Sequence, residues 1–196
     1  MSVEILEESI TVGLREHATI SIAFRVDRVL ALDIVEGGLG GIRLVERLVE
    51  TPWIKDYDAD DDPEGKSSTG WARRFDLTNW GLLSAWIGGR RVGGAVIAFD
   101  TPGLNMLRGQ NDLAVLWDIR VQPAFRGVGV GTALFQRVER WAMARSCHRL
   151  EVETQNINVP ACRFYARQGC QLGMINRLAY ADLPGEIELL WYKAVL

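Results

Sequence analysis

The sequence contains few cysteines and histidines, and this scarcity excludes several kinds of site. Its 196 residues include only three cysteines and two histidines. Cys147, Cys162 and Cys170 do not have the spacing of metal ligands, and an odd number of cysteines argues against a disulfide framework. We therefore expect neither a metal site nor a disulfide-stapled fold.

Long apolar runs and an excess of positive charge are also missing. No stretch approaches the roughly 20 apolar residues that span a bilayer, and the acidic N-terminus is unlike the basic start of a signal peptide. The net charge of −3 argues against a nucleic-acid-binding face. We expect a cytoplasmic protein with no membrane and no nucleic-acid partner.

The composition and length that are present suit a single globular domain over residues 1–196. Hydrophobic residues make up 48% of the chain and charged residues 24%, which is ordinary for a globular protein. Helical spacing of apolar residues predicts helices at 40–50, after residue 130 and at 160–169. Apolar runs predict strands at 29–35, 82–87, 92–99, 113–121, 149–154, 171–180 and 186–194. This order predicts an α/β fold with a central mixed, mostly antiparallel sheet flanked by helices.

One segment departs from this composition. Six of the nine residues at positions 56–64 are acidic, and such a run repels itself, so residues 55–70 are predicted to form a loop. A plain solvated loop and electrostatic steering of a cationic substrate both stay open as its role. The first 80 residues carry no motif that assigns them a function.

Between residues 121 and 135, an apolar strand leads into a turn with one arginine and three alternating glycines. Gly127, Gly129 and Gly131 allow a tight turn and a close approach of backbone N–H groups to a ligand. These N–H groups lie at a predicted helix N-terminus, which favours phosphate, and Arg126 adds a permanent cation. The pattern predicts a pyrophosphate cradle; a turn that only joins a strand to a helix is the alternative.

The glycine spacing distinguishes among the folds that bind pyrophosphate. The dinucleotide fingerprint G-x-G-x-x-G fails because Thr132 stands at its third glycine, and the P-loop pattern fails because no lysine follows. What remains, Arg126-x-x-Gly129-x-Gly131, resembles the acetyl-coenzyme A signature of the GNAT N-acetyltransferases. The resemblance implies a GNAT-like α/β sandwich that uses acetyl-CoA as cosubstrate and no metal. It also implies that the backbone of Ile119 and Val121 binds the acetyl and pantetheine groups, and that the pyrophosphate is bound by Arg126, Gly127, Val128, Gly129, Gly131 and Thr132.

A second motif follows the predicted strand at 149–154. The GNAT pattern Asn-x-x-Ala-x-x-x-Tyr maps onto Asn158, Ala161 and Tyr165. By this resemblance, Asn158 hydrogen-bonds the pantetheine arm and Tyr165 donates a proton to the departing sulfur. The alternatives are that Asn158 caps a helix, which is compatible with the first role, and that Tyr165 only packs beneath the sheet.

Acetyl transfer to an amine also requires a base, because a lysine-type amine has a pKa of about 10.4 and arrives protonated. Asp118 is a carboxylate inside an apolar strand, and such a group is usually paired or functional. Arg120 lies on the same strand face and is its alternative partner; an ordered water is the alternative base. A covalent acyl-enzyme on Cys162 is less favoured than core packing, because no histidine accompanies the cysteine.

Longer segments of the C-terminal half resemble the streptothricin acetyltransferases. They are Leu116–Val121, Glu153–Gly169, Ile175–Tyr180 and Leu190–Lys193, all within residues 92–196. The resemblance implies direct acetylation, in a ternary complex, of a primary amine on a small molecule such as a streptothricin-like antibiotic. An acetyltransferase of peptide or protein amines and a non-catalytic acyl-CoA-binding module stay open as alternatives. Pairing of the terminal strands between two copies would give a homodimer.

Overall fold

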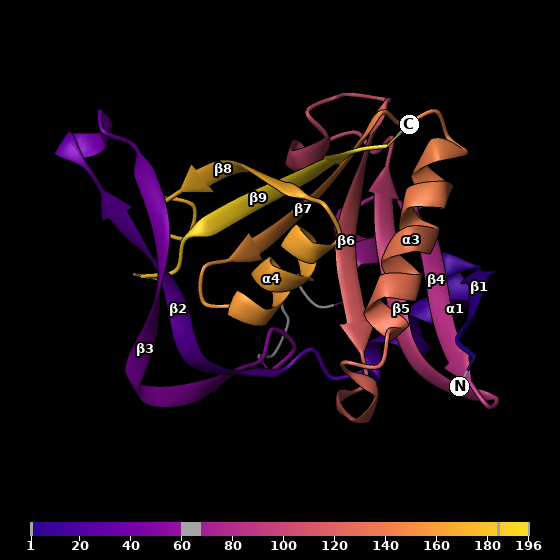
Figure 1. The fold of residues 1–196 in the computed structure, drawn as a ribbon. Coiled ribbons are helices and arrows are strands. Elements are labelled where there is room, and N and C mark those ends of the chain that lie inside the picture. Colours follow the sequence, from indigo (N-terminus) through magenta and orange to yellow (C-terminus); the bar gives the residue numbers. More distant parts are fainter. Residues whose placement is uncertain (1, 60–67, 184, 196) are drawn as a thin grey trace. The chain divides into compact units, whose positions relative to one another are not determined.

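The computed structural model describes residues 2–59, 68–183 and 185–195, and it contains two sheets (Figure 1). Seven strands are hydrogen-bonded in the order β1-β4-β5-β6-β7-β9-β8, and β2 pairs with β3 in a separate sheet. The larger sheet is mixed, because β1, β4, β5 and β6 pair antiparallel whereas β6 and β7 pair parallel. The predicted α/β fold with a mixed sheet flanked by helices is thus confirmed. The chain divides into two compact units, and the single-domain organisation stays a prediction.

The first unit comprises residues 1–22, 57–152 and 192–196. Its elements are β1 (Glu4–Glu8), α1 (Ile10–Ala18), α2 (Trp71–Arg74), β4 (Gly81–Ile87), β5 (Arg90–Phe99), η2 (Asn105–Leu107), β6 (Leu113–Val121), η3 (Pro123–Phe125) and α3 (Val130–Met143). It also contains the start of β7 (Arg149–Gln155) and the end of β9 (Glu188–Ala194). The predicted acidic loop falls in part outside the described residues, at 60–67.

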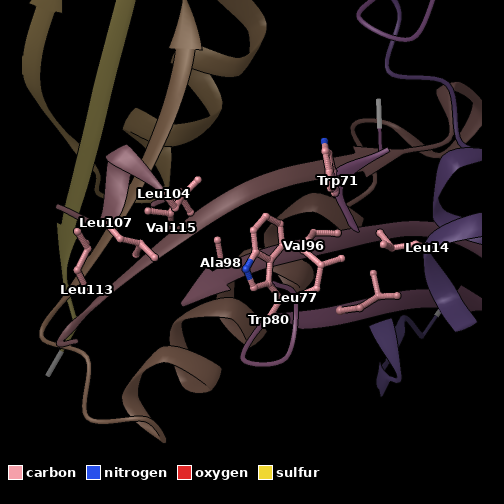
Figure 2. Packing of buried hydrophobic residues seen from close by; sticks show 11 residues of the cluster. Leu14, Trp71, Leu77, Trp80, Val96, Ala98, Leu104, Leu107, Leu113 and Val115 are labelled. Carbon is pink, nitrogen blue, oxygen red and sulfur yellow. The ribbon is translucent and has the colours of Figure 1, made fainter. Parts of the chain in front are cut away.

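Apolar side chains cover both faces of the sheet in this unit. Helix α3 packs against β4, β5 and β6 with the face that its periodicity predicts (Figure 1). Gly81 accommodates α3, because a Cβ at this position would lie 2.5 Å from the Trp141 ring. A second group of buried apolar residues packs against other positions of these strands. It includes Trp71 and Trp80, which lie beside Val96 and Ala98 of β5 (Figure 2). The two tryptophan rings lie 6.1 Å apart, so this aromatic group belongs to the core.

The second unit comprises residues 23–56 and 153–191. It contains β2 (Phe24–Ile34), η1 (Glu36–Gly38), β3 (Ile42–Lys55), the end of β7, α4 (Val159–Arg167), β8 (Gln171–Asn176) and the start of β9. Asn156 connects its segments: the side-chain Nδ2 donates to Leu30 O at 3.1 Å, and the Oδ1 accepts from Ile187 N at 2.8 Å. Among the residues that the structure describes, no helix is long and apolar enough to cross a membrane.

The predicted helix at 40–50 is wrong, because residues 42–50 belong to strand β3. Ile42, Val45, Leu48 and Val49 have helical spacing, but Ile42 and Leu44 also flank Arg43 as in an alternating strand, so the start of the segment fits both periods. Pairing with β2 along almost the whole strand decides between the two. Pro52 does not end the element; it lies where the register shifts, between the Leu48 and Trp53 pairs, in a bulge that tolerates proline.

Strand β6 carries a bulge that changes which face its side chains occupy. Val96 of β5 lies opposite Asp118, whereas the next residue, Ile97, lies opposite Leu116, so Trp117 is an extra residue in β6. An extra residue interrupts the alternation of side chains, so Trp117 and Asp118 share one face. The bulge thereby turns Asp118 toward the face that α1 covers.

Candidate active site

The predicted cradle is the turn between β6 and α3. Gly127 has a φ of 80° and Gly129 a φ of 97°, values that other residues rarely adopt. The backbone conformation, and not a lack of space, requires glycine at these two positions, because a Cβ at either one would meet no atom of the described residues within 4 Å. Gly129 is the N-cap of α3, so the N–H groups of the first helical turn lie at this turn between β6 and α3. The turn is exposed and poor in side chains, a geometry that fits a diphosphate.

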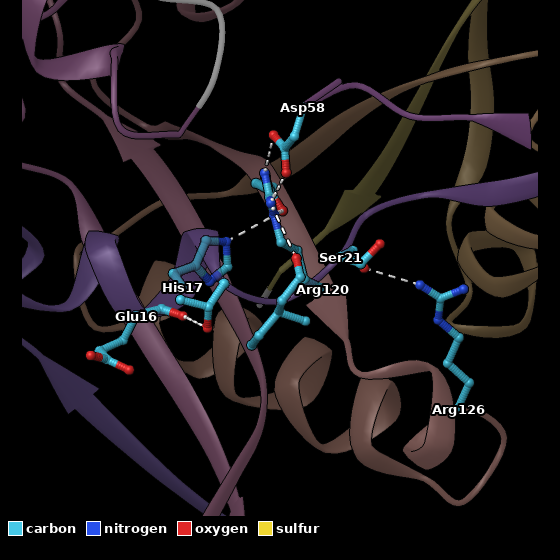
Figure 3. A network of polar contacts seen from close by, with 9 residues as sticks. Glu16, His17, Ser21, Asp58, Arg120 and Arg126 are labelled. Carbon is cyan, nitrogen blue, oxygen red and sulfur yellow. Dashed lines mark hydrogen bonds and ion pairs between the residues drawn. The ribbon is translucent and has the colours of Figure 1, made fainter. Parts of the chain in front are cut away.

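Arg126 supplies a cation beside this turn. Its Nε donates to Val121 O at 3.0 Å, and its Nη2 donates to Ser21 O at 3.1 Å (Figure 3). Burial lowers the pKa of Arg126, but an arginine starts so far above neutral pH that the group stays charged. Backbone carbonyls therefore hold a permanent positive charge next to the glycines.

The backbone of β6 has hydrogen-bonding groups on the edge away from β5. Gln122 N donates to Val92 O at 2.8 Å. Bonded and non-bonded residues alternate in an antiparallel pair, so the N–H and C=O groups of Ile119 and Val121 point to the other edge. On that edge, the described pairing with β7 covers only residues 113–115. The two residues predicted to bind the acetyl and pantetheine groups thus have backbone groups that point away from β5 beyond the end of the pairing, and one of these groups, Val121 O, accepts from Arg126 Nε.

Asp118 and Arg120 form the buried centre of a charged network, in which Arg120, His17 and Asp58 are labelled in Figure 3. The Arg120 Nε donates to both Asp118 oxygens, at 3.1 and 2.9 Å, and its Nη2 donates to Oδ2 at 2.8 Å. The Nε2 of His17, from α1, lies 3.4 Å from Asp118 Oδ1. Arg120 also donates to Ile20 O at 3.2 Å and to both carboxylate oxygens of Asp58. The buried carboxylate of Asp118 therefore has the guanidinium of Arg120 as a fixed counter-charge.

This environment bears on the predicted role of Asp118 as a base. Burial disfavours its charged form, but the hydrogen bonds and charges of His17 and Arg120 outweigh burial and lower the pKa of Asp118. A carboxylate with a lowered pKa is a weak proton acceptor near neutral pH. The geometry favours the alternative that Arg120 is the partner of Asp118, and the base role stays a hypothesis.

Asn158 and Tyr165 both lie on α4 in the second unit. Asn158 is the N-cap of the helix, and its Oδ1 accepts from Ala161 N at 3.2 Å. The cap uses the carbonyl side of the amide, so the NH2 group is what Asn158 can offer a ligand. Tyr165 is buried, with its ring 5.4 Å from that of Phe164. Capping of α4 by Asn158 is confirmed, and the roles of both residues toward a ligand stay predictions.

A second carboxylate in this unit has a different environment. Glu153 of β7 accepts from the Tyr180 hydroxyl at 2.5 Å, and Glu188 lies on the neighbouring strand β9. Burial, together with the like charge of Glu188, raises the pKa of Glu153, and the Tyr180 hydrogen bond opposes this rise only in part. A carboxylate with a raised pKa accepts a proton more readily near neutral pH. Glu153 is therefore the better base of the two.

Glu153 was not singled out from the sequence, although it opens the segment 153–169 that carries the family resemblance. Strand β7 reads Arg-Leu-Glu-Val-Glu-Thr-Gln, and in such an alternating strand a carboxylate is ordinary, unlike Asp118 in the apolar strand β6. The structure separates the two glutamates of β7, because Glu151 pairs with Arg108 at 2.5 Å and with Arg149 at 2.8 Å. Glu153 instead has the Tyr180 hydroxyl as its hydrogen-bond partner.

The cysteines are in environments that disfavour the thiolate. All three are free and buried. Burial raises the pKa of the Cys162 thiol to about 12 and that of Cys147 to about 11. Because the thiolate is the nucleophile, neither is activated at neutral pH. The described residues contain no cluster of three or more His, Cys, Asp or Glu side chains that could hold a metal.

Comparisons with known proteins identify relatives of this chain. Residues 43–170, more than half of the chain, match the model of the acetyltransferase (GNAT) family. A streptothricin acetyltransferase of Escherichia coli is 32% identical over 155 residues, covering 78% of this chain and 76% of that protein. Streptothricin acetyltransferase A of Bacillus subtilis (strain 168) is 38% identical over 84 residues; this match spans 42% of the chain and about half, 49%, of the relative.

The fold also has a counterpart among solved structures. An acetyltransferase of Bacillus anthracis str. Ames, solved in complex with acetyl coenzyme A, superimposes with a TM-score of 0.74 and 24% identity. The superposition covers 98% of this chain and 99% of the other. At this identity the likeness establishes the shared fold.

Proposed function

Because the chain belongs to the GNAT acetyltransferase family, we propose that it transfers an acetyl group from acetyl-CoA to a primary amine of a small molecule. The observation that carries this proposal is the cradle, in which two left-handed glycines, a helix N-terminus and Arg126 form a site for a diphosphate. Coenzyme A contains such a diphosphate, and the solved relative from Bacillus anthracis was crystallised with acetyl coenzyme A.

In this proposal, residues 126–132 hold the diphosphate, and the backbone of Ile119 and Val121 holds the acyl and pantetheine groups. Acetyl-CoA supplies an acetyl group activated as a thioester. Asn158 hydrogen-bonds the pantetheine arm.

The reaction converts an ammonium group and a thioester into an amide, a thiol and one proton. Glu153 takes a proton from the ammonium group, so that the neutral amine can attack the acetyl carbonyl directly. The C–S bond breaks as the C–N bond forms, and the Tyr165 hydroxyl gives its proton to the departing sulfur. The second proton lost by the nitrogen returns through solvent to Tyr165, and the proton on Glu153 leaves to solvent.

The amine acceptor is proposed to be a streptothricin-like antibiotic. Two relatives with this acceptor in their names, from Escherichia coli and Bacillus subtilis, are 32% and 38% identical over the matched residues. The segment from Glu153 to Gly169 that carries the resemblance also contains the proposed base and acid. Two other readings compete: an acetyltransferase of peptide or protein amines, within the same fold, and, from another class, an acyl-CoA-binding module without turnover.

A thiol-release assay with acetyl-CoA over a panel of amines separates these readings. We expect rapid release of coenzyme A with streptothricin and slow release with short peptides and with free lysine. Mass spectrometry should find one acetyl group added to the antibiotic. Turnover with peptide amines alone would establish the second reading, and acetyl-CoA binding without turnover of any amine would establish the third.

Tyr165→Phe should lower kcat by about 100-fold, at the low end of the range for a lost general acid. The change removes only a hydroxyl from a buried ring, so the dissociation constant of acetyl-CoA, measured by calorimetry, should stay within about twofold. Tyr192→Phe, which removes the same group from β9, serves as the matched control and should keep wild-type kcat. Full activity of Tyr165→Phe would remove Tyr165 from the mechanism.

A further inference from the structure

Glu153 lies in a small polar cluster formed by three segments of the second unit. Tyr180, in the segment after β8, donates its hydroxyl to Glu153 Oε1 at 2.5 Å, and Gln155 Nε2 donates to the Tyr180 oxygen at 3.0 Å. Glu188 lies on β9, the strand next to β7 in the sheet, and Asn176 of β8 donates to Glu188 Oε2 at 3.0 Å. Tyr180 is thus a neutral hydrogen-bond donor to Glu153, and Asn176 is a neutral donor to Glu188.

No cation of the described residues is among the groups that act on the pKa of Glu153, which are Tyr180 and Glu188. Lys55, the last residue of β3, is paired with Glu186 at 2.7 Å. A negative charge on Glu188 repels one on Glu153, so burial and Glu188 together keep Glu153 protonated to a higher pH than an isolated glutamate would be.

The two neighbours of Glu153 act in opposite senses. A negative charge on Glu188 makes the second negative charge on Glu153 less favourable. The Tyr180 hydroxyl donates to the charged form of Glu153 and makes it more favourable; burial and the two glutamates raise the pKa of Tyr180 itself, so it stays a neutral donor. The ionisation of Glu153 therefore depends on a balance between an acidic and a phenolic neighbour.

We propose that Glu188 and Tyr180 are positioning residues that set, in opposite directions, the pH at which Glu153 releases its proton and can act as the base. This inference rests on the proposed function, in which Glu153 is the base for the acceptor amine. Glu188 holds Glu153 protonated to a higher pH, and Tyr180 limits that effect. The pair thereby places the ionisation of the base closer to the pH at which the enzyme works.

The test compares Glu188→Gln with Tyr180→Phe in the full-length protein. Removing the negative charge should move the acid limb of the kcat/KM–pH profile to lower pH by about one unit, and removing the phenol should move it to higher pH by a similar amount. Glu186→Gln removes a carboxylate two positions along the chain that pairs with Lys55, and should leave the limb in place. A purely structural role would lower activity in both variants without opposite shifts.

A second measurement follows the ionisation itself without turnover. In protein with 13C-labelled glutamate carboxyl groups, Glu153→Gln identifies the signal of Glu153, whose titration is then followed in the two neighbour variants. Opposite shifts in this titration support the inference, and an unmoved or same-direction titration overturns it. Opposite titration shifts with an unmoved kinetic limb would instead overturn Glu153 as the base, while the amine panel tests the acetyltransferase function independently.

Discussion

Gly129→Glu is expected to weaken acetyl-CoA binding by at least about 100-fold, which corresponds to about 2.8 kcal/mol of binding free energy. Two effects add at this position. The φ of 97° is strained for any residue with a Cβ, at a cost of roughly 1–2 kcal/mol. A carboxylate within about 5 Å of a phosphate charge also costs roughly 3 kcal/mol at an effective dielectric constant near 20. Calorimetric titration with acetyl-CoA measures the loss.

The control for this variant is Gly103→Glu. Gly103 lies in the loop between β5 and β6 with a φ of 80°, and it also has open space around it. This change introduces the same charge and a similar backbone strain outside the turn between β6 and α3, so it should bind acetyl-CoA with wild-type affinity. If Gly129→Glu kept wild-type affinity, the assignment of residues 126–132 as the diphosphate site would be wrong.

Glu153→Gln is expected to lower kcat by about 100- to 10,000-fold, the range for loss of a general base. Glutamine keeps the shape of the side chain and its contact with Tyr180 but cannot take a proton. The dissociation constant of acetyl-CoA should change little, because the proposed cofactor contacts do not include residue 153. Because the pKa of Glu153 is raised, wild-type kcat/KM should fall as pH decreases through a value above that of an ordinary glutamate.

Asp118→Asn provides the comparison with the other buried carboxylate. It leaves the buried guanidinium of Arg120 with less counter-charge, so the main loss should be in stability, about 3 kcal/mol by denaturant unfolding. The acid limb of the pH–rate profile should stay in place, since the pKa of Asp118 is already lowered. A variant that unfolds normally but loses the acid limb would return the base role to Asp118.

Structural features that depend only on residues close together in the sequence could be predicted from the sequence alone. The glycines at 127 and 129 and the helix that follows them are local features, because a left-handed turn and an apolar helix face depend on neighbours close in sequence. The same holds for the hairpin between β4 and β5 and for the cap that Asn158 provides to α4. The acetyl-CoA half of the proposed site was for this reason predictable.

The secondary structure of a segment could not be predicted where the spacing of its apolar residues fits both a helix and a strand. Residues 42–50 suit a helix or a strand, and only pairing with β2, which lies up to about twenty residues earlier in the chain, made them a strand. The bulge at Trp117 is likewise a property of the β5–β6 pair, and it decides which face Asp118 occupies.

By itself, the sequence determined the family, the turn with its left-handed glycines and the cap that Asn158 gives to α4, because each of these depends on residues within a few positions of one another. Only the tertiary structure distinguished the carboxylates. Asp118 has Arg120 and His17 as partners, whereas Glu153 has Tyr180 and Glu188, and three of these four lie more than twenty residues away from the carboxylate they contact. A carboxyl group's readiness to accept a proton follows from its burial and from the charges that folding brings against it, and neither is present in the local sequence.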